Sequence, residues 1–301
     1  MELRHLRYFI AVAEERNFTR AAVRVGIGQP PLSQQIRSLE DELGTPLFRR
    51  TRQGAELTAA GAAFLPEART VIAQAEHAKQ AARRGGRGEL GRLRVGFTAS
   101  AAFVAAVPDA VRAFTRRYPD VALSLVERET ELLLDRLRED RLDAALIRTA
   151  TSADDEVDII VLLQEPFVIA VPAGHRLVGK KSARLSALAA EPLVLFPRHA
   201  GPSLFDGLIT ACRSAGFEPL MGQEAPQFSS AVNLVAAGLG VSLVPASMAQ
   251  LRVAGVRYVP IAGAAPTVKL ALATRRDEPS VLVGNFSAIL RQRCLSHRRS
   301  S

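Results

Sequence analysis

The alternation of apolar and polar residues over the first 45 positions predicts three short helices. Apolar residues recur every three or four positions at Leu3, Leu6, Phe9, Ile10 and Ala13, and then at Ala21, Ala22 and Val25. Asn17 and Thr19 are candidate caps of the second helix. In the third helix, Leu32, Ile36, Leu39 and Leu43 are expected to face the other helices, with Ser33, Gln34, Arg37 and Glu40 pointing outward.

The segment that follows predicts a β-hairpin beside the third helix. Residues 47–58 place two apolar residues, a turn that contains glycine, and several arginines in a short stretch. An arginine near the hairpin tip, Arg52, can enter a minor groove of DNA, whereas Arg49 and Arg50 suit contacts with phosphates or with structural acidic residues. Together these elements predict a winged helix-turn-helix domain over residues 1–58.

The outward face of the third helix carries the side-chain types that read bases. Glutamine pairs with adenine and arginine with guanine in the major groove. Two prolines start this helix and would bring its N-terminal dipole to a phosphate. For the helices alone, a solvated polar face on an ordinary three-helix domain remains the alternative. The expected DNA contacts are Thr19, Gln29, Pro30, Pro31, Ser33, Gln34, Arg37, Arg50 and Arg52.

A long linker helix is predicted between residue 59 and the glycine-rich run at 85–91, which marks the main domain boundary. Residues with heptad spacing along it are Phe64, Ala68, Val71, Ala75, Ala78 and Ala82. This spacing predicts a dimerisation seam. A helix packed on its own chain is the alternative.

Beyond residue 92, strand-like and helical runs alternate, which indicates an α/β domain. Ligands of such domains gather at the carboxyl ends of the strands, where helices begin. Ser100, Thr130 and the pair Pro202 and Ser203 each follow a predicted strand. We therefore expect them at one rim, where they can also serve as helix caps. The arginine-rich end of the chain is expected to be a frayed, solvated terminus.

Composition narrows the chemistry only a little. The 301 residues are 48% hydrophobic and 23% charged, with a net charge of +9, of which +4 falls in residues 1–90. An anionic partner is favoured, but charge alone supports DNA binding weakly. The two cysteines, Cys212 and Cys294, and the scattered histidines show no metal-ligand spacing, so no metal site is expected. No run of 18 apolar residues predicts a membrane span, and we expect a cytoplasmic protein.

Enzyme signatures are incomplete. Residues 174–180 have the spacing of a phosphate-binding loop, but Lys181 occupies the position that requires Ser or Thr. The glycines at 238 and 240 precede a strand-like run rather than a helix, and no nucleophile elbow occurs. We expect no catalytic residues and no cofactor.

Taken together, the motifs resemble those of the LysR-type transcriptional regulators over essentially the whole chain. The segments that carry the resemblance are LRHLRYF at 3–9, FTRAA at 18–22, QPPLSQQI at 29–36, LEDELG at 39–44, LFRR at 47–50 and LTAAG at 57–61. The resemblance implies an N-terminal DNA reader, a linker helix over 59–91 and a two-lobed effector domain of the periplasmic-binding-protein type over 92–301. Lobe I would comprise about 92–163 and 267–301, and lobe II about 164–266.

The same resemblance implies the partners and the effector site. Family members assemble as dimers of dimers on double-stranded promoter DNA, and we expect RNA polymerase as a further partner. The chain looks similar to the subgroup that senses aromatic acids and their ring-cleavage products, which implies an activator that responds to a small organic acid. The expected effector contacts are Ser100, Thr130, Arg148, Pro202, Ser203 and Phe228. The alternatives are a redox-responsive regulator of the same family, and a small-molecule-binding protein without promoter specificity.

Overall fold

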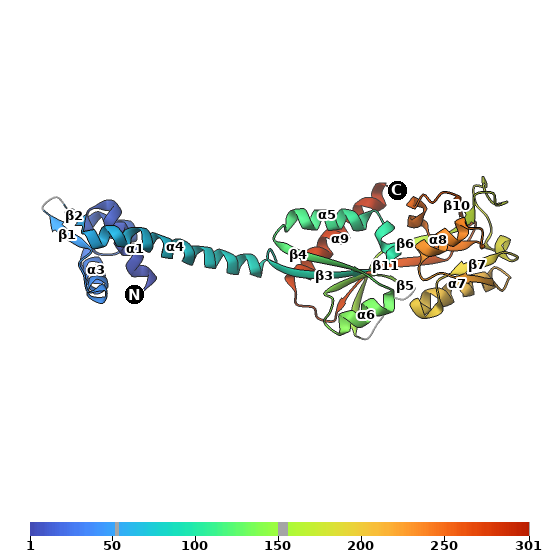
Figure 1. Ribbon diagram of the computed structural model, residues 1–301, viewed down its shortest axis with the longest axis horizontal. Helices are drawn as coiled ribbons and strands as arrows, with labels where there is room; N and C mark the ends of the chain where they lie inside the picture. The colour runs from blue at the N-terminus through green and yellow to red at the C-terminus, as the bar shows by residue number, and fades with distance from the viewer. Residues whose placement is uncertain (52–53, 150–155, 301) are drawn as a thin grey trace. The chain divides into compact units, whose positions relative to one another are not determined.

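The computed structural model describes residues 1–51, 54–149 and 156–300, and its contacts divide the chain into two units at Gly85/Gly86. The first unit contains three helices, a two-stranded hairpin and a long helix (Figure 1). These elements are α1 (Leu3–Glu15), α2 (Phe18–Val25), α3 (Gln29–Leu43), β1 (Phe48–Thr51), β2 (Gly54–Leu57) and α4 (Ala59–Gly86). The predicted winged helix-turn-helix and linker helix are therefore confirmed.

The apolar residues at helical spacing form the core of the first unit, as expected. Leu6, Phe9, Leu32, Ile36 and Leu39 are almost completely buried in one cluster. Leu43, which was expected to face the other helices, is instead 38% exposed, because it lies in the last turn of α3, where that helix ends at Gly44.

The wing is fixed to the helices by main-chain contacts. The N–H of Ala55 donates to the carbonyl of Arg16 at 2.9 Å. Gly54 has φ +139°, and a Cβ there would lie 2.2 Å from the same carbonyl oxygen, so only glycine fits. Glu40 also holds the hairpin, since its Oε1 accepts from the N–H groups of Leu47 and Phe48 at 2.7 and 3.0 Å. Glu40 was expected to point outward, and this prediction was wrong.

Helix α4 shows that the expected dimerisation stripe has two parts. Phe64 packs its ring 5.1 Å from that of Phe9, and Ala68 is buried in the same core. These two residues are thus occupied within their own unit, which is the alternative considered for the helix. The rest of the stripe is half-buried or exposed and consists of Val71, which is 42% exposed, Ala75, Ala78 and Ala82.

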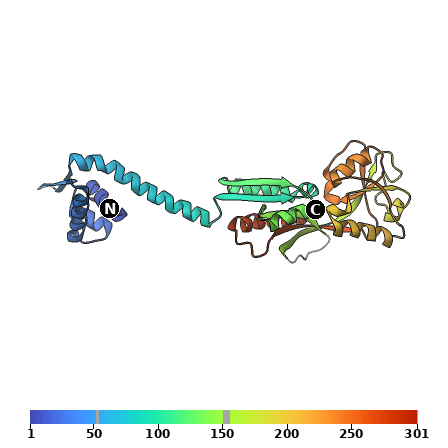
Figure 2. The same cartoon turned by 60° about the horizontal axis from the view of Figure 1, so that its bottom comes forward.

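The second unit has two lobes. Lobe I contains β3 (Gly91–Phe97), η1 (Ala99–Phe103), α5 (Ala106–Arg117), β4 (Val121–Glu127), α6 (Thr130–Arg138), β5 (Ala144–Thr149) and α9 (Val281–Ser300). Lobe II contains η2 (Leu185–Leu188), β7 (Pro192–Leu195), η3 (Arg198–Ala200), α7 (Pro202–Ser214), β8 (Leu220–Glu224), α8 (Phe228–Ala236), β9 (Ser242–Pro245), η4 (Ala246–Gln250) and β10 (Val256–Pro260). Strands β6 (Val157–Pro172) and β11 (Thr267–Arg275) connect the lobes (Figure 2).

The strands of the second unit other than β7 and β8 form one sheet with the order β10-β6-β11-β5-β3-β4, and β9 pairs with β6. Strands β7 and β8 pair with each other in parallel. Alternation along the strands separates two layers in lobe I: Leu146 and Leu272 face α5 and α9, whereas Ile147 and Ala271 face α6 (Figure 1). Because β6 runs for 16 residues and pairs with β11 in lobe I and with β9 and β10 in lobe II, both lobes share a continuous strand.

The C-terminal segment is helical and not frayed, although Arg291 and Arg293 are exposed to solvent as expected. It forms α9, and Val283, Phe286, Leu290 and Cys294 along it are buried in the core of lobe I. Their spacing of three or four positions accounts for the helix. None of the helices in the described ranges is long and apolar enough to cross a membrane.

Candidate DNA interface and effector pocket

The helix-turn-helix is set by local sequence. Asn17 caps α2, because its side-chain oxygen accepts from the N–H groups of Thr19 and Arg20 at 2.9 and 3.1 Å. Gly26 ends α2 at φ +74°, a conformation that favours glycine, and Pro30 and Pro31 occupy the first turn of α3. The exposed Thr19 is therefore at the start of α2, near its cap.

On α3 the structure separates the expected base-reading residues. Gln34 and Arg37 are exposed one turn apart, and within residues 1–51 and 54–85 no carboxylate forms an ion pair with Arg37. Ser33 is only 7% exposed, and its Oγ accepts from the side-chain amide of Gln29 at 2.8 Å. The outward orientation predicted for Ser33 was wrong, because it shares the inner face with Leu32 and Ile36.

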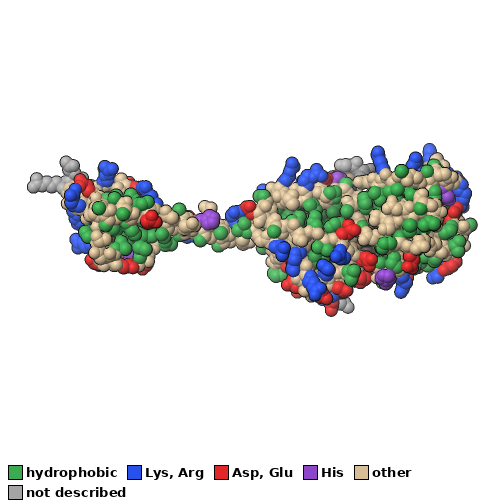
Figure 3. All heavy atoms as spheres, viewed as in Figure 1, with side chains coloured by type: hydrophobic (Ala, Val, Ile, Leu, Met, Phe, Trp, Pro, Cys, Tyr) green, Lys and Arg blue, Asp and Glu red, His purple; other side chains and the backbone are tan. Residues whose placement is uncertain are grey.

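Arginines of the wing are held in two different ways. The guanidinium of Arg50 lies 4.8 Å from the centre of the Phe18 ring, an arrangement that fixes a cation beside α2 without neutralising it. Arg49 is paired with Glu56 at 2.7 Å across the hairpin. Arg52, expected at the tip, lies outside the described residues. On the face seen in Figure 3, basic side chains of this unit are interspersed with acidic ones.

A pocket lies between lobes I and II of the second unit and encloses about 470 Å³ of space, part of it open to solvent. Helices α6, α7 and α8 all begin at its rim: Thr130, Gly201 and Phe228 line it. None of these helices has a side-chain cap hydrogen bond. Their first N–H groups have no partner within the helix and favour an anion.

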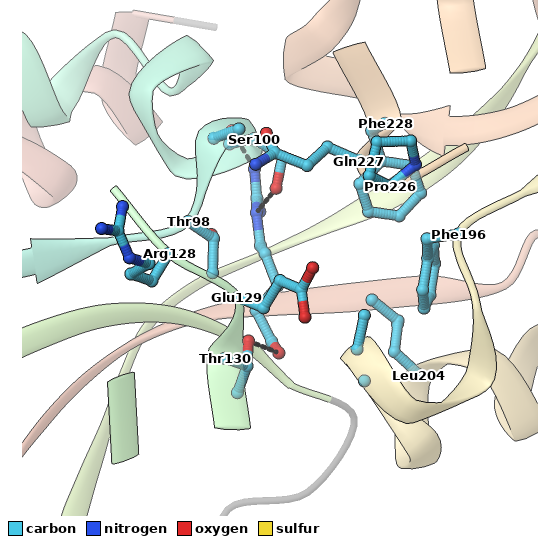
Figure 4. Close-up of a pocket in the computed structure, with 14 residues that line it drawn as sticks. Thr98, Ser100, Arg128, Glu129, Thr130, Phe196, Leu204, Pro226, Gln227 and Phe228 are labelled. Atoms are coloured by element: carbon cyan, nitrogen blue, oxygen red, sulfur yellow. Dashed lines mark hydrogen bonds between the residues drawn. The ribbon is translucent and has the colours of Figure 1, made fainter. Parts of the chain in front are cut away.

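Four of the expected effector residues, Ser100, Thr130, Arg148 and Phe228, line this pocket (Figure 4). Pro202 and Ser203 do not. Their neighbours Gly201 and Leu204 take that place, while the side chain of Ser203 is exposed. The hydroxyl of Thr130 donates to the carbonyl of Arg148 at 3.3 Å, so it also ties α6 to β5.

Arg148 lines the pocket but brings no free charge to it. It is 4% exposed, and its Nη1 donates to Oε1 of Glu165 on β6 at 2.6 Å. Its other nitrogens donate to Oγ and the carbonyl of Ser100 at 3.3 and 3.0 Å, and to Oγ of Ser247 at 3.1 Å. Burial lowers the pKa of Arg148, and the Glu165 carboxylate opposes that change. Arg148, an expected effector contact, therefore lines the pocket with its charge already paired.

Glu165 makes this network a link between the lobes. Its Oε2 accepts from the N–H of Ser247 in η4 at 2.5 Å, and its Oε1 accepts from the hydroxyl of Ser247 at 3.0 Å. Ser100 in lobe I and Ser247 in lobe II therefore meet the same buried ion pair. Sequence reasoning missed Glu165, since nothing local distinguishes it from a solvated strand residue.

Other polar wall residues of the pocket were also missed: Thr98, Arg128, Glu129 and Gln227. Each stands at or just after the end of a strand, or just before a helix, which is the positional signal that identified Ser100 and Thr130. Arg198 in η3 forms an exposed ion pair with Asp206 at 2.7 Å, and this hydrogen-bonded contact raises the pKa of Arg198.

Comparison with known families matches both units. Residues 3–62 match the bacterial regulatory helix-turn-helix protein model of the lysR family, and residues 86–295 match the LysR substrate binding domain.

Similar proteins extend over almost the whole chain. The uncharacterized HTH-type transcriptional regulator YnfL of Escherichia coli (strain K12) is 42% identical over 87% of this chain and 88% of its own. The HTH-type transcriptional regulator BudR of Raoultella terrigena is 41% identical over 95% of this chain and 99% of its own. The crystal structure of CbnR, a LysR family transcriptional regulator, is 32% identical, covers 96% of this chain and 100% of its own, and superposes with a TM-score of 0.84. CbnR complexed with its target DNA superposes with a TM-score of 0.81 at 31% identity, over 98% of this chain and 100% of its own. The chain thus belongs to the LysR family of DNA-binding transcriptional regulators, which are not enzymes, and carries the effector-binding domain of that family.

Proposed function

We propose that this protein binds a specific promoter sequence in double-stranded DNA through α3 and the wing. Gln34 and Arg37 contact base edges, Pro30 and Pro31 place the start of α3 at a phosphate, and Arg50 holds a second phosphate. The support is that Gln34 and Arg37 are exposed together and that Arg37 has no carboxylate partner among the described residues of its unit. The similar protein CbnR is known in complex with its target DNA.

Assembly follows from the exposed part of the α4 stripe. Two copies pair through Val71, Ala75, Ala78 and Ala82, and the two-fold symmetry of the pair matches a two-fold operator. Two such dimers form the tetramer, which activates transcription through contact with RNA polymerase.

The effector is a small organic acid in the pocket between the lobes. The observation that carries this proposal is the meeting of three uncapped helix N-termini at one pocket, since each offers N–H groups to a carboxylate. Phe196, Leu204 and Phe228 supply an apolar wall, which suits an aromatic or aliphatic body.

The burial of both cysteines disfavours the alternative of a redox-responsive regulator. Cys212 is fully buried, and burial, with the nearby Glu218 carboxylate, raises the pKa of its thiol to about 11. Thiolate is the reactive form, so a thiol of this kind reacts poorly at neutral pH. Cys294 is buried in the core of lobe I.

The DNA-binding proposal is tested by fluorescence anisotropy on the DNA upstream of the protein's own gene and on scrambled DNA at one salt concentration. Arg37→Ala should cost about 1–3 kcal/mol on the specific site and relax base preference, whereas Arg50→Ala should weaken binding to both DNAs alike. Arg213→Ala, in an exposed ion pair of lobe II, is the matched control and should leave binding unchanged. Equal losses on both DNAs for Arg37→Ala would refute its role in base recognition.

A further inference from the structure

The pocket between the lobes has two chemically different walls. Lobe I contributes polar residues, among them Thr98, Glu129 and Thr130, whereas lobe II contributes mainly apolar ones, among them Phe196 and Leu204 (Figure 4). A molecule that fills it therefore places a polar head on lobe I and an apolar body on lobe II.

Glu129 decides what kind of head this is. Its carboxylate points toward the wall formed by Phe196 and Leu204, whereas Arg128 points the other way (Figure 4). Nη1 of Arg128 donates to the carbonyl of Glu127 at 2.7 Å. In the part of the chain that the structure describes, no basic side chain forms an ion pair with Glu129. A carboxylate only accepts hydrogen bonds, so a ligand that covers the half-buried Glu129 must itself offer a donor in place of water.

A second polar group on the same wall lacks a partner. Thr98 is 8% exposed and lines the pocket, and its hydroxyl forms no hydrogen bond with any described residue. A buried hydroxyl without a partner costs free energy. This oxygen has almost no exposed surface, so it is out of reach of a molecule in the pocket, and Glu129 is the group of lobe I that a ligand can satisfy.

The acceptor and the free helix N–H groups are direct neighbours in the chain. Glu129 is the N-cap residue of α6, and Thr130 is its first helical residue. A ligand carboxylate at this N-terminus would by itself face the Glu129 carboxylate, which is unfavourable between like charges. A donor on the carbon next to the ligand carboxylate reduces the conflict, because an N–H or O–H group then lies between the two carboxylates and donates to Glu129, and an ammonium group also brings an opposite charge.

We propose that the effector is an α-amino or α-hydroxy acid with an apolar side chain, and that Glu129 selects it by accepting from the α substituent. This inference rests on the proposed effector function of the pocket and specifies its ligand class. It predicts discrimination against acids that differ only in lacking the α donor.

Isothermal titration of the full chain with two matched series tests this. One series is phenylalanine, 3-phenyllactate and 3-phenylpropanoate, and the other is leucine, 2-hydroxy-4-methylpentanoate and 4-methylpentanoate. In at least one series a donor-bearing acid should bind tenfold or more tightly than the acid without the donor. Glu129→Gln should remove most of that preference, by weakening the donor-bearing acid and strengthening the other. Glu127→Gln, an exposed carboxylate at the end of β4 that does not line the pocket, should change nothing.

The outcomes separate this inference from the proposed function. The role of Glu129 is overturned if all acids within each series bind equally, or if Glu129→Gln leaves the preference intact. The proposed effector function stands in either case if any of the acids alters operator binding. Absence of binding by all six acids overturns the inference, while the proposed effector function still covers organic acids outside these two series. Sequence-selective DNA binding is measured without any acid, so its failure is seen independently.

Discussion

Replacing Glu165 by glutamine should destabilise the second unit far more than removing any exposed carboxylate. The substitution keeps the size of the side chain but leaves Arg148, with 4% of its surface exposed, as a buried cation without its counter-ion. Breaking a buried pair from one side costs about 3–5 kcal/mol. For a unit of this size each kcal/mol lowers Tm by about 2–4 °C, so the fall should be roughly 6–20 °C.

Differential scanning calorimetry of the full chain measures this change in the transition of the second unit. Glu218→Gln is the matched control, because its bidentate pair with Arg213 is exposed and should contribute about 1 kcal/mol or less. Replacing both partners, with Arg148→Met and Glu165→Leu together, should cost less than the single change, since no charge is left unpaired. A Glu165→Gln protein that melts with the control would refute the assignment of a buried, stabilising pair.

Two further predictions follow, one for each unit. Gly54→Ala should lower the free energy of unfolding of the first unit by at least about 2 kcal/mol in urea, because the new Cβ meets the Arg16 carbonyl. Gly26→Ala is the control: its Cβ has open space, so it should cost only about 1–2 kcal/mol for the left-handed backbone. Equal losses of stability in the two variants would contradict the close approach of Gly54 to Arg16. Burial opposes ionisation of Asp143, but hydrogen bonds from Arg94 outweigh it and lower the pKa of Asp143 below its ordinary value of 3.8. The stabilising contribution of Asp143 to the second unit is therefore present above pH 4 and is lost as pH falls through the lowered pKa. Asp143→Asn should make the free energy of unfolding depend less steeply on pH in the acid range. An unchanged slope below pH 4 would count against the Arg94 contact.

How far the sequence predicted this molecule depends on whether the signal was local. The helices of the first unit were predictable because their apolar residues repeat at helical spacing, and the wing because glycine and arginine stand between apolar residues. Ser33 escaped the same reasoning, since a polar residue that pairs with Gln29 on the inner face looks like a solvated one. The helical spacing of Val283, Phe286 and Leu290 was available, but the arginines around it suggested a solvated end.

The pocket shows the limit more clearly. Ser100 and Thr130 were found from their position after strands, which any α/β domain shares. Glu165 pairs with Arg148 only because β5 and β6 both lie beside β11 in the sheet, and its other partner, Ser247, is 82 positions away. Contacts of this kind depend on topology, and no periodicity along one segment reports them.

The two-walled construction of the pocket has a consequence for how such proteins diversify. Its polar wall comes from residues near 98–130 and its apolar wall from residues near 196–228, so the two are encoded in separate stretches of the gene. A substitution at Leu204 alters the size of the ligand body that fits and leaves the polar groups of lobe I untouched. Selection can therefore change the side chain that a descendant accepts one mutation at a time, while the recognition of the head group is inherited unchanged.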